Sequence, residues 1–148
     1  MTEITKFDDI IDLRDVIARF EELEAEKEAL SDAYDEAQKG TQDEINARAA
    51  LNDWKNGDEG EEFDSLRQLI QDCEGNGGDE QWRGDWYPVT LIRHSYFKDY
   101  AQELAEECGM IQDNAKWPYT CIDWDRAARE LLIDYTTVSF RGVDYHCR

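Results

Sequence analysis

A row of apolar positions near the N-terminus is the longest regular pattern in the chain. The positions recur at alternating steps of three and four, which is the heptad spacing of a helix with one apolar seam. They are Leu13, Val16, Phe20, Leu23, Lys27, Leu30, Tyr34 and Ala37. The lysine interrupts the seam and can help to fix its register. An exposed apolar stripe of this length usually marks a contact, so we expect it to pack on later helices or on a second copy of the chain.

Two further helices are predicted before residue 74. Gly40 ends the first helix, and Thr41 with Glu44 fits a capping box for a helix over about 41–55. Its inward positions are expected to be Ile45, Ala47, Leu51 and Trp54. Residues 56–62 read as an acidic loop, and a third helix is expected over about 62–73. The first two helices predict an antiparallel helical hairpin.

The pattern changes after a glycine-rich acidic stretch around residues 75–84, which reads as a linker. A short extended segment follows at 86–92, then helices over about 95–108 and 122–133, with Ser95 as the expected cap of the first. The end alternates around Arg141-Gly142, which is the signature of a two-residue β-hairpin. The expected fold is therefore α+β, with an acidic helical region at 1–74, the linker, and a small α+β domain at 85–148.

Composition narrows the functional classes. The chain has 148 residues, with 36 acids against 16 bases and a formal net charge of −20. A protein that binds nucleic acid directly needs a basic surface, so we expect no direct binding of nucleic acid here. No apolar run is long enough for a membrane span, and the N-terminus lacks the basic and apolar parts of a secretory signal, so we expect no membrane partner and a cytoplasmic location. The hydrophobic content of 41% and aromatic content of 11% favour a folded chain over a disordered one.

Residues with catalytic or metal-binding chemistry form no recognisable motif. The four cysteines include no CxxC pair, and His146-Cys147 alone is a weak metal signal. An EF-hand-like register that begins at Asp72 has Arg83 where the bidentate acid belongs. His94 and Ser95 are neighbours without a triad context. We expect neither an enzyme nor a cofactor.

The acidity itself is the informative feature. Residues 1–80 carry 25 acids and 8 bases, whereas residues 81–148 carry 11 and 8. A net charge of −20 equals the phosphates of about ten base pairs. Such a field attracts a basic groove, although an acidic surface can also serve only solubility. Expected partner-binding acids are Asp12, Asp15, Glu21, Glu22, Glu24, Glu28, Asp58, Glu59, Glu61, Glu62, Asp64, Asp99, Glu103, Glu106, Glu107, Asp123 and Asp125.

The C-terminal part carries a family resemblance. The segment 96–109, YFKDYAQELAEECG, is followed by 122–131, IDWDRAAREL, and by the terminal hairpin 138–145, VSFRGVDY. Over about residues 86–148 this resembles the C-terminal domain of the ArdA antirestriction proteins of mobile elements and phages. The resemblance implies an acidic DNA mimic that occupies the DNA site of a type I restriction–modification enzyme in a bacterial host.

Two other functions stay open. One is an anti-CRISPR protein that occupies the basic DNA channel of an effector complex. The other is an interaction protein whose heptad helix assembles a coiled coil, with incidental charge. For all three functions we expect a homodimer, with these seam residues in the contact: Leu13, Val16, Phe20, Leu23, Leu30 and Tyr34.

Overall fold

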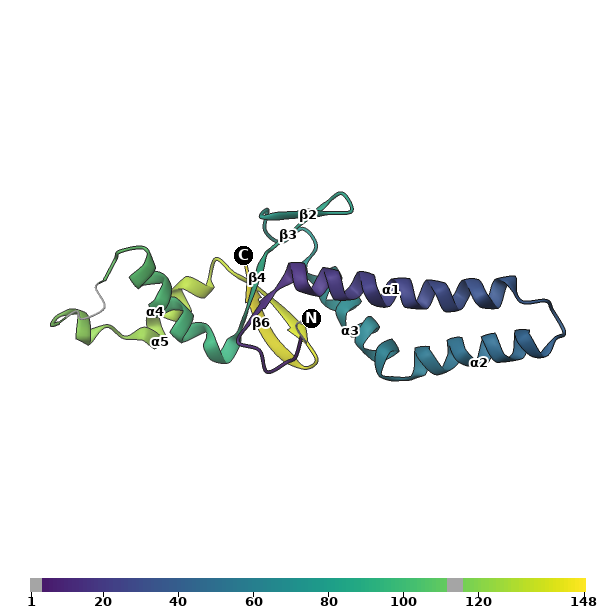
Figure 1. The fold of residues 1–148 in the computed structure, drawn as a ribbon. Helices are drawn as coiled ribbons and strands as arrows, with labels where there is room; N and C mark the ends of the chain where they lie inside the picture. The colour runs from purple at the N-terminus through teal and green to yellow at the C-terminus, as the bar shows by residue number, and fades with distance from the viewer. Residues whose placement is uncertain (1–3, 112–115) are drawn as a thin grey trace. The chain divides into compact units, whose positions relative to one another are not determined.

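The chain forms an α+β fold, shown in Figure 1 as a computed structural model that describes residues 4–111 and 116–148. Its described residues form five α-helices and two antiparallel sheets, and the chain ends in a β-hairpin. Two compact units make up the chain. One comprises Arg14–Asp72, and the other joins the N-terminal segment up to Leu13 to Cys73–Arg148.

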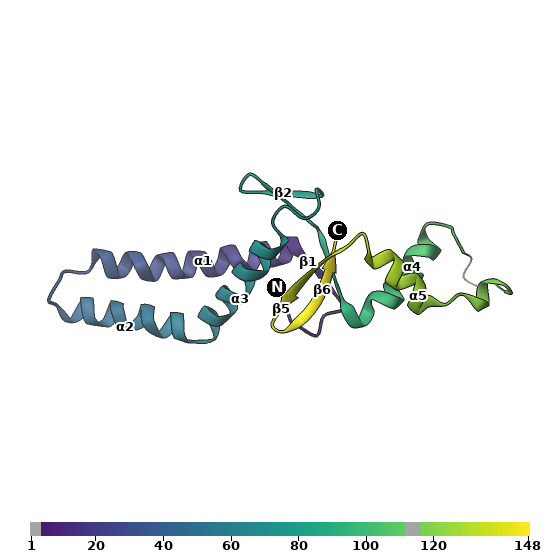
Figure 2. The same ribbon diagram turned by 180° about the vertical axis from the view of Figure 1, so that it is seen from behind.

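The unit Arg14–Asp72 is helical. It consists of α1 (Leu13–Glu36), α2 (Gln42–Asn56) and α3 (Asp58–Cys73), with the first residue of α1 and the last of α3 assigned to the other unit. Both Figure 1 and Figure 2 show α2 returning alongside α1. The side chain of Thr41 accepts a hydrogen bond from the backbone N–H of Glu44, so the predicted cap of α2 is confirmed.

The apolar core of this helical unit lies between α1 and α3. Phe20 of α1 stacks on Phe63 of α3 with ring centroids 5.0 Å apart. Trp54 of α2 packs on the same Phe63 ring at 5.8 Å. The fully or nearly buried side chains are Val16, Ile17, Phe20, Leu23, Leu51, Phe63, Leu66, Leu69 and Ile70. The first half of the heptad seam is therefore buried within a single chain, whereas Leu30 and Tyr34 are only half-buried.

Two sequence predictions in this helical unit are wrong. The residues predicted to form an acidic loop from 56 to 62 mostly belong to α3, which begins at Asp58. Gly57 is enough to turn the chain, and acids in the first turn of α3 favour a helix N-terminus because they face its positive dipole end. Ile45, predicted to point inward, is 59% exposed. A Cβ at Gly60 would overlap with the Lys55 carbonyl, so glycine permits the tight corner between α2 and α3.

The second unit is built on a four-stranded antiparallel sheet in the order β1-β4-β6-β5. Its strands are β1 (Ile10–Asp12), β4 (Thr90–Arg93), β5 (Thr136–Phe140) and β6 (Val143–Cys147). Arg141 and Gly142 both have positive φ, of 51° and 80°, so the predicted terminal hairpin is confirmed with the turn that two-residue hairpins favour. Tyr145 and Leu91 are fully buried in this sheet.

Two short segments that the sequence places outside the α+β domain form strands of the second unit. The N-terminal β1, which the sequence groups with the helices, pairs with β4 so that Ile11 lies opposite Leu91. Within the stretch predicted as a linker, β2 (Glu80–Trp82) pairs with β3 (Asp85–Tyr87). Both β1 and β2 are only three residues long, which is too short to show an alternating pattern in the sequence.

Two helices pack on this sheet, α4 (Phe97–Glu107) and α5 (Trp124–Leu132). Ile92, Phe97, Ala101 and Ala128 form their common core. Ser95 does not cap α4; it lies in a 3-10 turn, and its Oγ accepts a hydrogen bond from Arg93 Nη1 at 2.6 Å. Asp123 caps α5 by accepting from the Arg126 backbone N–H at 3.2 Å. Among the described residues, no helix is long and apolar enough to cross a membrane.

Candidate acidic interaction surface

Negative charge is shared almost equally between the two structural units. Arg14–Asp72 carries 18 acids and 7 bases, a net charge of −11. The other unit carries 18 acids and 9 bases, a net charge of −9. The strong imbalance between the first and second parts of the sequence therefore does not carry over to the folded units, because the acidic segments at 8–12 and 74–80 belong to the unit that contains the sheet.

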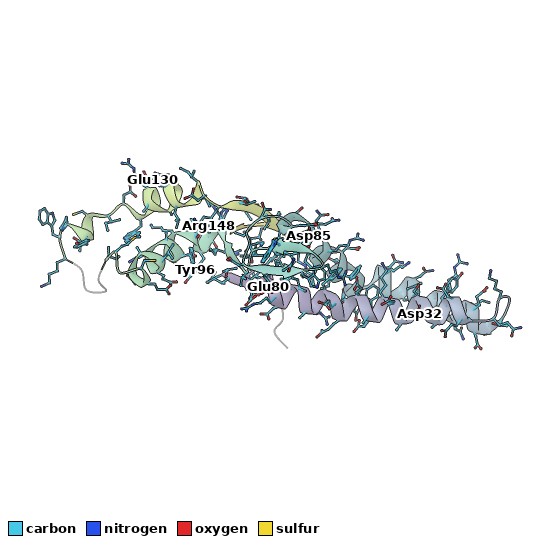
Figure 3. All side chains as sticks on the ribbon, turned by 90° about the horizontal axis from the view of Figure 1, so that it is seen from above. Asp32, Glu80, Asp85, Tyr96, Glu130 and Arg148 are labelled. Atoms are coloured by element: carbon cyan, nitrogen blue, oxygen red, sulfur yellow. The ribbon has the colours of Figure 1, made fainter. Side chains whose placement is uncertain are left out.

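All 18 acids of the helical unit lie on helices. Fifteen of them are exposed to solvent, and Glu24, Glu44 and Glu62 are half-buried. Asp32, labelled in Figure 3, lies in the last third of α1. The exposed acids are Asp15, Glu21, Glu22, Glu26, Glu28, Asp32, Asp35, Glu36, Asp43, Asp53, Asp58, Glu59, Glu61, Asp64 and Asp72.

Several acids of α1 are placed where they destabilise a helix. Glu24 is followed four residues later by Glu28, and the series continues to Asp32 and Glu36. Each like-charge pair at this spacing costs about 0.2–0.5 kcal/mol. Asp35 and Glu36 also lie in the last turn, which contains no base, and they face the negative end of the helix dipole. Helix stability alone does not account for this pattern.

The charge is dense along the second part of α1. Residues Glu21–Glu36 include eight acids and one base, a net charge of −7. At 1.5 Å per residue they extend over about 24 Å, or roughly one net charge per 3.4 Å. That is about the spacing of phosphates along one strand of duplex DNA. We call this stretch, residues 21–36 of α1, the acidic face.

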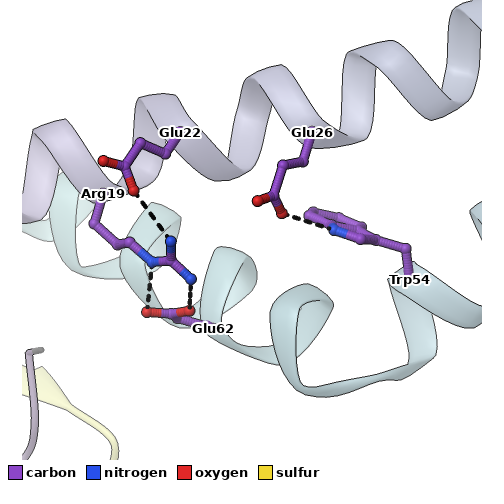
Figure 4. Close-up of polar contacts among 5 residues, drawn as sticks. All are labelled: Arg19, Glu22, Glu26, Trp54 and Glu62. Atoms are coloured by element: carbon purple, nitrogen blue, oxygen red, sulfur yellow. Dashed lines mark hydrogen bonds and ion pairs between the residues drawn. The ribbon is translucent and has the colours of Figure 1, made fainter. Parts of the chain in front are cut away.

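Some of the predicted partner-binding acids are already used within the fold. Arg19 binds Glu62 of α3 through two nitrogens, at 2.8 and 3.1 Å, and donates to Glu22 at 3.1 Å (Figure 4). These contacts, chiefly the hydrogen bond to Glu62, raise the pKa of Arg19 above its usual value. Glu26, which is outside the predicted set, accepts a hydrogen bond from the Trp54 indole at 3.2 Å (Figure 4). Glu62 and Glu26 therefore join α1 to α3 and to α2, whereas Glu22 pairs with Arg19 within α1.

The predicted acids of the sheet-containing unit divide in the same way. Glu103 accepts a hydrogen bond from the Tyr96 hydroxyl at 2.7 Å, which raises the pKa of Tyr96 to about 12. Asp125 pairs with Lys98 at 3.3 Å, and Asp123 is the α5 cap. Asp99 and Glu107 are exposed on α4, and Glu106 is half-buried there. Asp12 lies on β1, on no helix, and is half-buried.

One further cluster was not predicted from the sequence. The Nδ1 atom of His94 lies 2.8 Å from Nε2 of His146, and Nδ1 of His146 lies 2.9 Å from the Thr137 hydroxyl. His146 is 3% exposed, and burial, with a smaller contribution from His94, lowers its pKa. Both ring nitrogens of His146 are thus engaged, which disfavours a metal at His146-Cys147. No local signal indicates this contact, because alternation along β6 puts His146 on the face opposite Tyr145 and Cys147, and its partner lies 52 residues away.

A polar cavity of about 380 Å³ lies in the sheet-containing unit. Tyr100 and Tyr135, with hydroxyl oxygens 3.4 Å apart, line it together with Asp79 and Arg148. Burial raises the pKa of Tyr135. Since Asp79 and Arg148 carry opposite charges, the lining favours neither an anion nor a cation. Among the residues that the structure describes, no group of three His, Cys, Asp or Glu side chains is arranged to hold a metal.

Comparison with known proteins gives no assignment: no family model, no curated protein and no solved structure matches the chain.

Proposed function

We propose that the protein is a DNA-mimic inhibitor that occupies the DNA-binding groove of a defence enzyme in the cytoplasm of a bacterial host. The observation that carries this proposal is the acidic face, with about one net charge per 3.4 Å of helix axis. Lysines and arginines that bind phosphates would meet carboxylates at a similar axial density of charge. Inhibition of this kind is competitive occupancy and needs neither a catalytic residue nor a cofactor.

Several acids are placed where they destabilise their helices, and this favours mimicry over an acidity that serves only solubility. Solubility needs only a modest net charge, which can be spread over mixed pairs that also stabilise helices. Here α1 keeps like charges four residues apart and has no base in its last turn. The last turn of α4 likewise has Glu106 and Glu107 and no base. A charge pattern retained at a cost to helix stability favours a role in binding.

A type I restriction–modification enzyme is the target that we propose first. Its only support is the resemblance of residues 86–148 to the ArdA antirestriction family, since the acidic face would suit other basic grooves equally well. The DNA channel of a CRISPR effector complex is the next candidate. Affinity capture from a bacterial lysate separates the two, because recovery of methyltransferase and specificity subunits supports the first and recovery of effector subunits the second.

Self-association through the helical unit is a second proposal with its own observation. Leu30 and Tyr34 are half-buried in the distal part of the seam, and Ile45 on α2 is 59% exposed. A second copy would cover these side chains, whereas Val16, Phe20 and Leu23 are already buried within one chain. We therefore place the dimer contact of the seam at Leu30 and Tyr34, and a coiled-coil role for α1 and α2 rests on that contact.

Competition with duplex DNA tests the main proposal directly. Purified target enzyme is titrated with a labelled duplex and then with the protein. Release of the duplex at equilibrium, in proportion to the protein added, supports mimicry. A ternary complex of enzyme, duplex and protein would contradict it.

A further inference from the structure

Two of the four cysteines lie together in the interior of the sheet-containing unit. Cys73 is the last residue of α3 and Cys147 the last residue of β6. Both are 0% exposed, and both are present as thiols. Their side chains are hydrogen-bonded to each other across 74 positions of sequence. Cys108 and Cys121, in contrast, are exposed.

The backbone around the pair holds the two cysteines in place. The N–H of Gly75 donates to the Trp86 carbonyl at 2.9 Å. Gly77 has a φ of +97°, and a Cβ there would lie 2.9 Å from the carbonyl oxygen of Arg148. The chain just after Cys73 therefore lies against the residue that follows Cys147. Glycine is required at 77 for this close approach.

We propose that Cys73 and Cys147 form a reversible intramolecular disulfide when the protein is exposed to a peroxide. The sulfur of one cysteine attacks a peroxide oxygen, so that the O–O bond breaks and a sulfenic acid forms. The sulfur of the second cysteine then attacks the sulfenic sulfur, and the S–O bond breaks as water leaves. With hydrogen peroxide, two thiols are oxidised by two electrons and the peroxide is reduced to two water molecules. A small dithiol reverses the reaction by thiol–disulfide exchange.

The contact between the two thiols also favours the thiolate form. The hydrogen bond from Cys73 lowers the pKa of Cys147, against the opposing effect of burial. The thiolate is the nucleophile, and whichever cysteine attacks the peroxide, the other lies beside it as the resolving thiol. Access requires local opening, and opening of the exposed glycine-rich stretch after Cys73 would break the hydrogen bond from Gly75 to Trp86.

The bond would constrain the unfolded chain strongly, because it closes a loop of about 75 residues. The oxidised protein should therefore melt at a higher temperature than the reduced one. For a chain of this length the expected rise in Tm is roughly 5–15 °C.

The test uses the full chain with both exposed thiols removed, as the double variant Cys108→Ser and Cys121→Ser. The protein is exposed to hydrogen peroxide and unfolded in the presence of N-ethylmaleimide, and its intact mass is measured by mass spectrometry. We expect loss of two hydrogen masses, no maleimide adduct and the higher Tm. If the oxidised protein is reduced with dithiothreitol before the maleimide is added, two adducts should form and the lower Tm should return.

The matched controls are Cys73→Ala and Cys147→Ala in the same background, which should each lose the rise in Tm. Because either change could disturb the core, peptide mapping of the peroxide-treated natural chain provides a second readout, and it should recover a peptide pair joined through Cys73 and Cys147. Oxidation of Cys108 in the natural chain shows that the peroxide treatment is effective. Two maleimide adducts on the double variant after the same treatment would overturn the proposal. A sulfinic acid at either buried cysteine, without a disulfide, would also overturn it.

Discussion

At the scale of single residues, Arg19 is one of the few bases in the chain, and it pairs with an acid inside the helical unit. Its guanidinium binds Glu62 through two parallel hydrogen bonds, and the side chains of both residues are about three-quarters buried. Two parallel bonds to one carboxylate require the planar fork that only arginine provides. Arg67, in comparison, meets Asp64 on an open surface at 3.5 Å.

Replacing Arg19 by lysine should therefore destabilise the helical unit. The Arg19→Lys variant cannot make both bonds, and it leaves Glu62 incompletely paired, at a cost of about 1–3 kcal/mol in the free energy of unfolding. The control Arg67→Lys should change that free energy by less than about 0.5 kcal/mol. Urea denaturation followed by circular dichroism measures both, and equal effects would show that the Arg19 contact stabilises the unit no more than the exposed Arg67 pair does.

His146 should make the stability of the protein depend on pH between about 5 and 7.5. Burial, supported by His94, lowers its pKa in the folded state, while the nearby Asp144 acts in the opposite direction. The unfolded chain, with an ordinary histidine pKa of about 6.5, binds a proton more readily than the folded one. Stability is therefore highest above pH 7 and falls as the pH drops through 6.5 and toward the lower folded value.

The measurement for His146 is the slope of the unfolding free energy against pH from 5.0 to 8.0. We expect a slope of up to about 1.4 kcal/mol per pH unit in the natural chain. The variant His146→Gln should have a flatter profile whatever its absolute stability. An unchanged slope in that variant would assign the pH dependence to other groups.

At the scale of helices and strands, local signals were sufficient where the cause of an element is local. Thr41 and Glu44 are three residues apart, and Arg141 with Gly142 forms a complete turn, so the sequence alone predicts both features correctly. The sequence does not indicate the N-terminus of α3, because clustered acids are typical of loops as well as of a helix start. The strand β1 and the contact of His94 with His146 depend on partners far away in sequence, and no local pattern encodes them.

The two ends of the acidic helices should respond to charge in opposite directions. Glu36 lies in the last turn of α1, four residues after Asp32, so Glu36→Lys removes repulsion and adds a favourable dipole interaction. We expect it to stabilise the helical unit by about 0.5–1 kcal/mol. Asp58 lies in the first turn of α3, so Asp58→Asn should destabilise by up to about 1 kcal/mol.

Urea denaturation at low salt is the appropriate measurement for Glu36 and Asp58, and both effects should shrink at 1 M salt because of screening. Glu36→Gln provides an intermediate control, since it removes the negative charge without adding a positive one. If Glu36→Lys and Asp58→Asn both destabilise the protein, the acids at the C-terminal end of α1 do not oppose the stability of that helix.

At the scale of the whole molecule, we expect a homodimer at micromolar concentration. Leu30, Tyr34 and Ile45 leave apolar surface partly uncovered in a single chain, and such surface commonly marks a contact. Light scattering should give twice the mass of the chain, and Leu30→Gln should shift the population toward monomer. Asp43→Asn, on α2 but without an apolar side chain, is the control. A monomer at high concentration would contradict the prediction.

Mimicry predicts that the acids act together, and the acidic face allows this to be tested without unfolding the protein. The variant with Glu28→Gln, Asp32→Asn, Asp35→Asn and Glu36→Gln removes only exposed acids that repel one another, so it should fold at least as well as the natural chain. We expect it to lose at least tenfold in apparent affinity for the target, whereas Glu28→Gln alone should lose little, because one screened surface charge contributes at most about 1 kcal/mol.

A matched set on the other unit, with Asp99→Asn, Glu103→Gln, Glu107→Gln and Asp125→Asn, shows which unit takes the place of the duplex. The natural complex should weaken with salt, but less steeply than the complex with DNA, because spaced carboxylates hold fewer condensed counterions. The protein alone should not shift duplex DNA at about 150 mM salt. If both four-acid variants inhibit normally while Leu30→Gln does not, the apolar surface carries the function and mimicry is wrong.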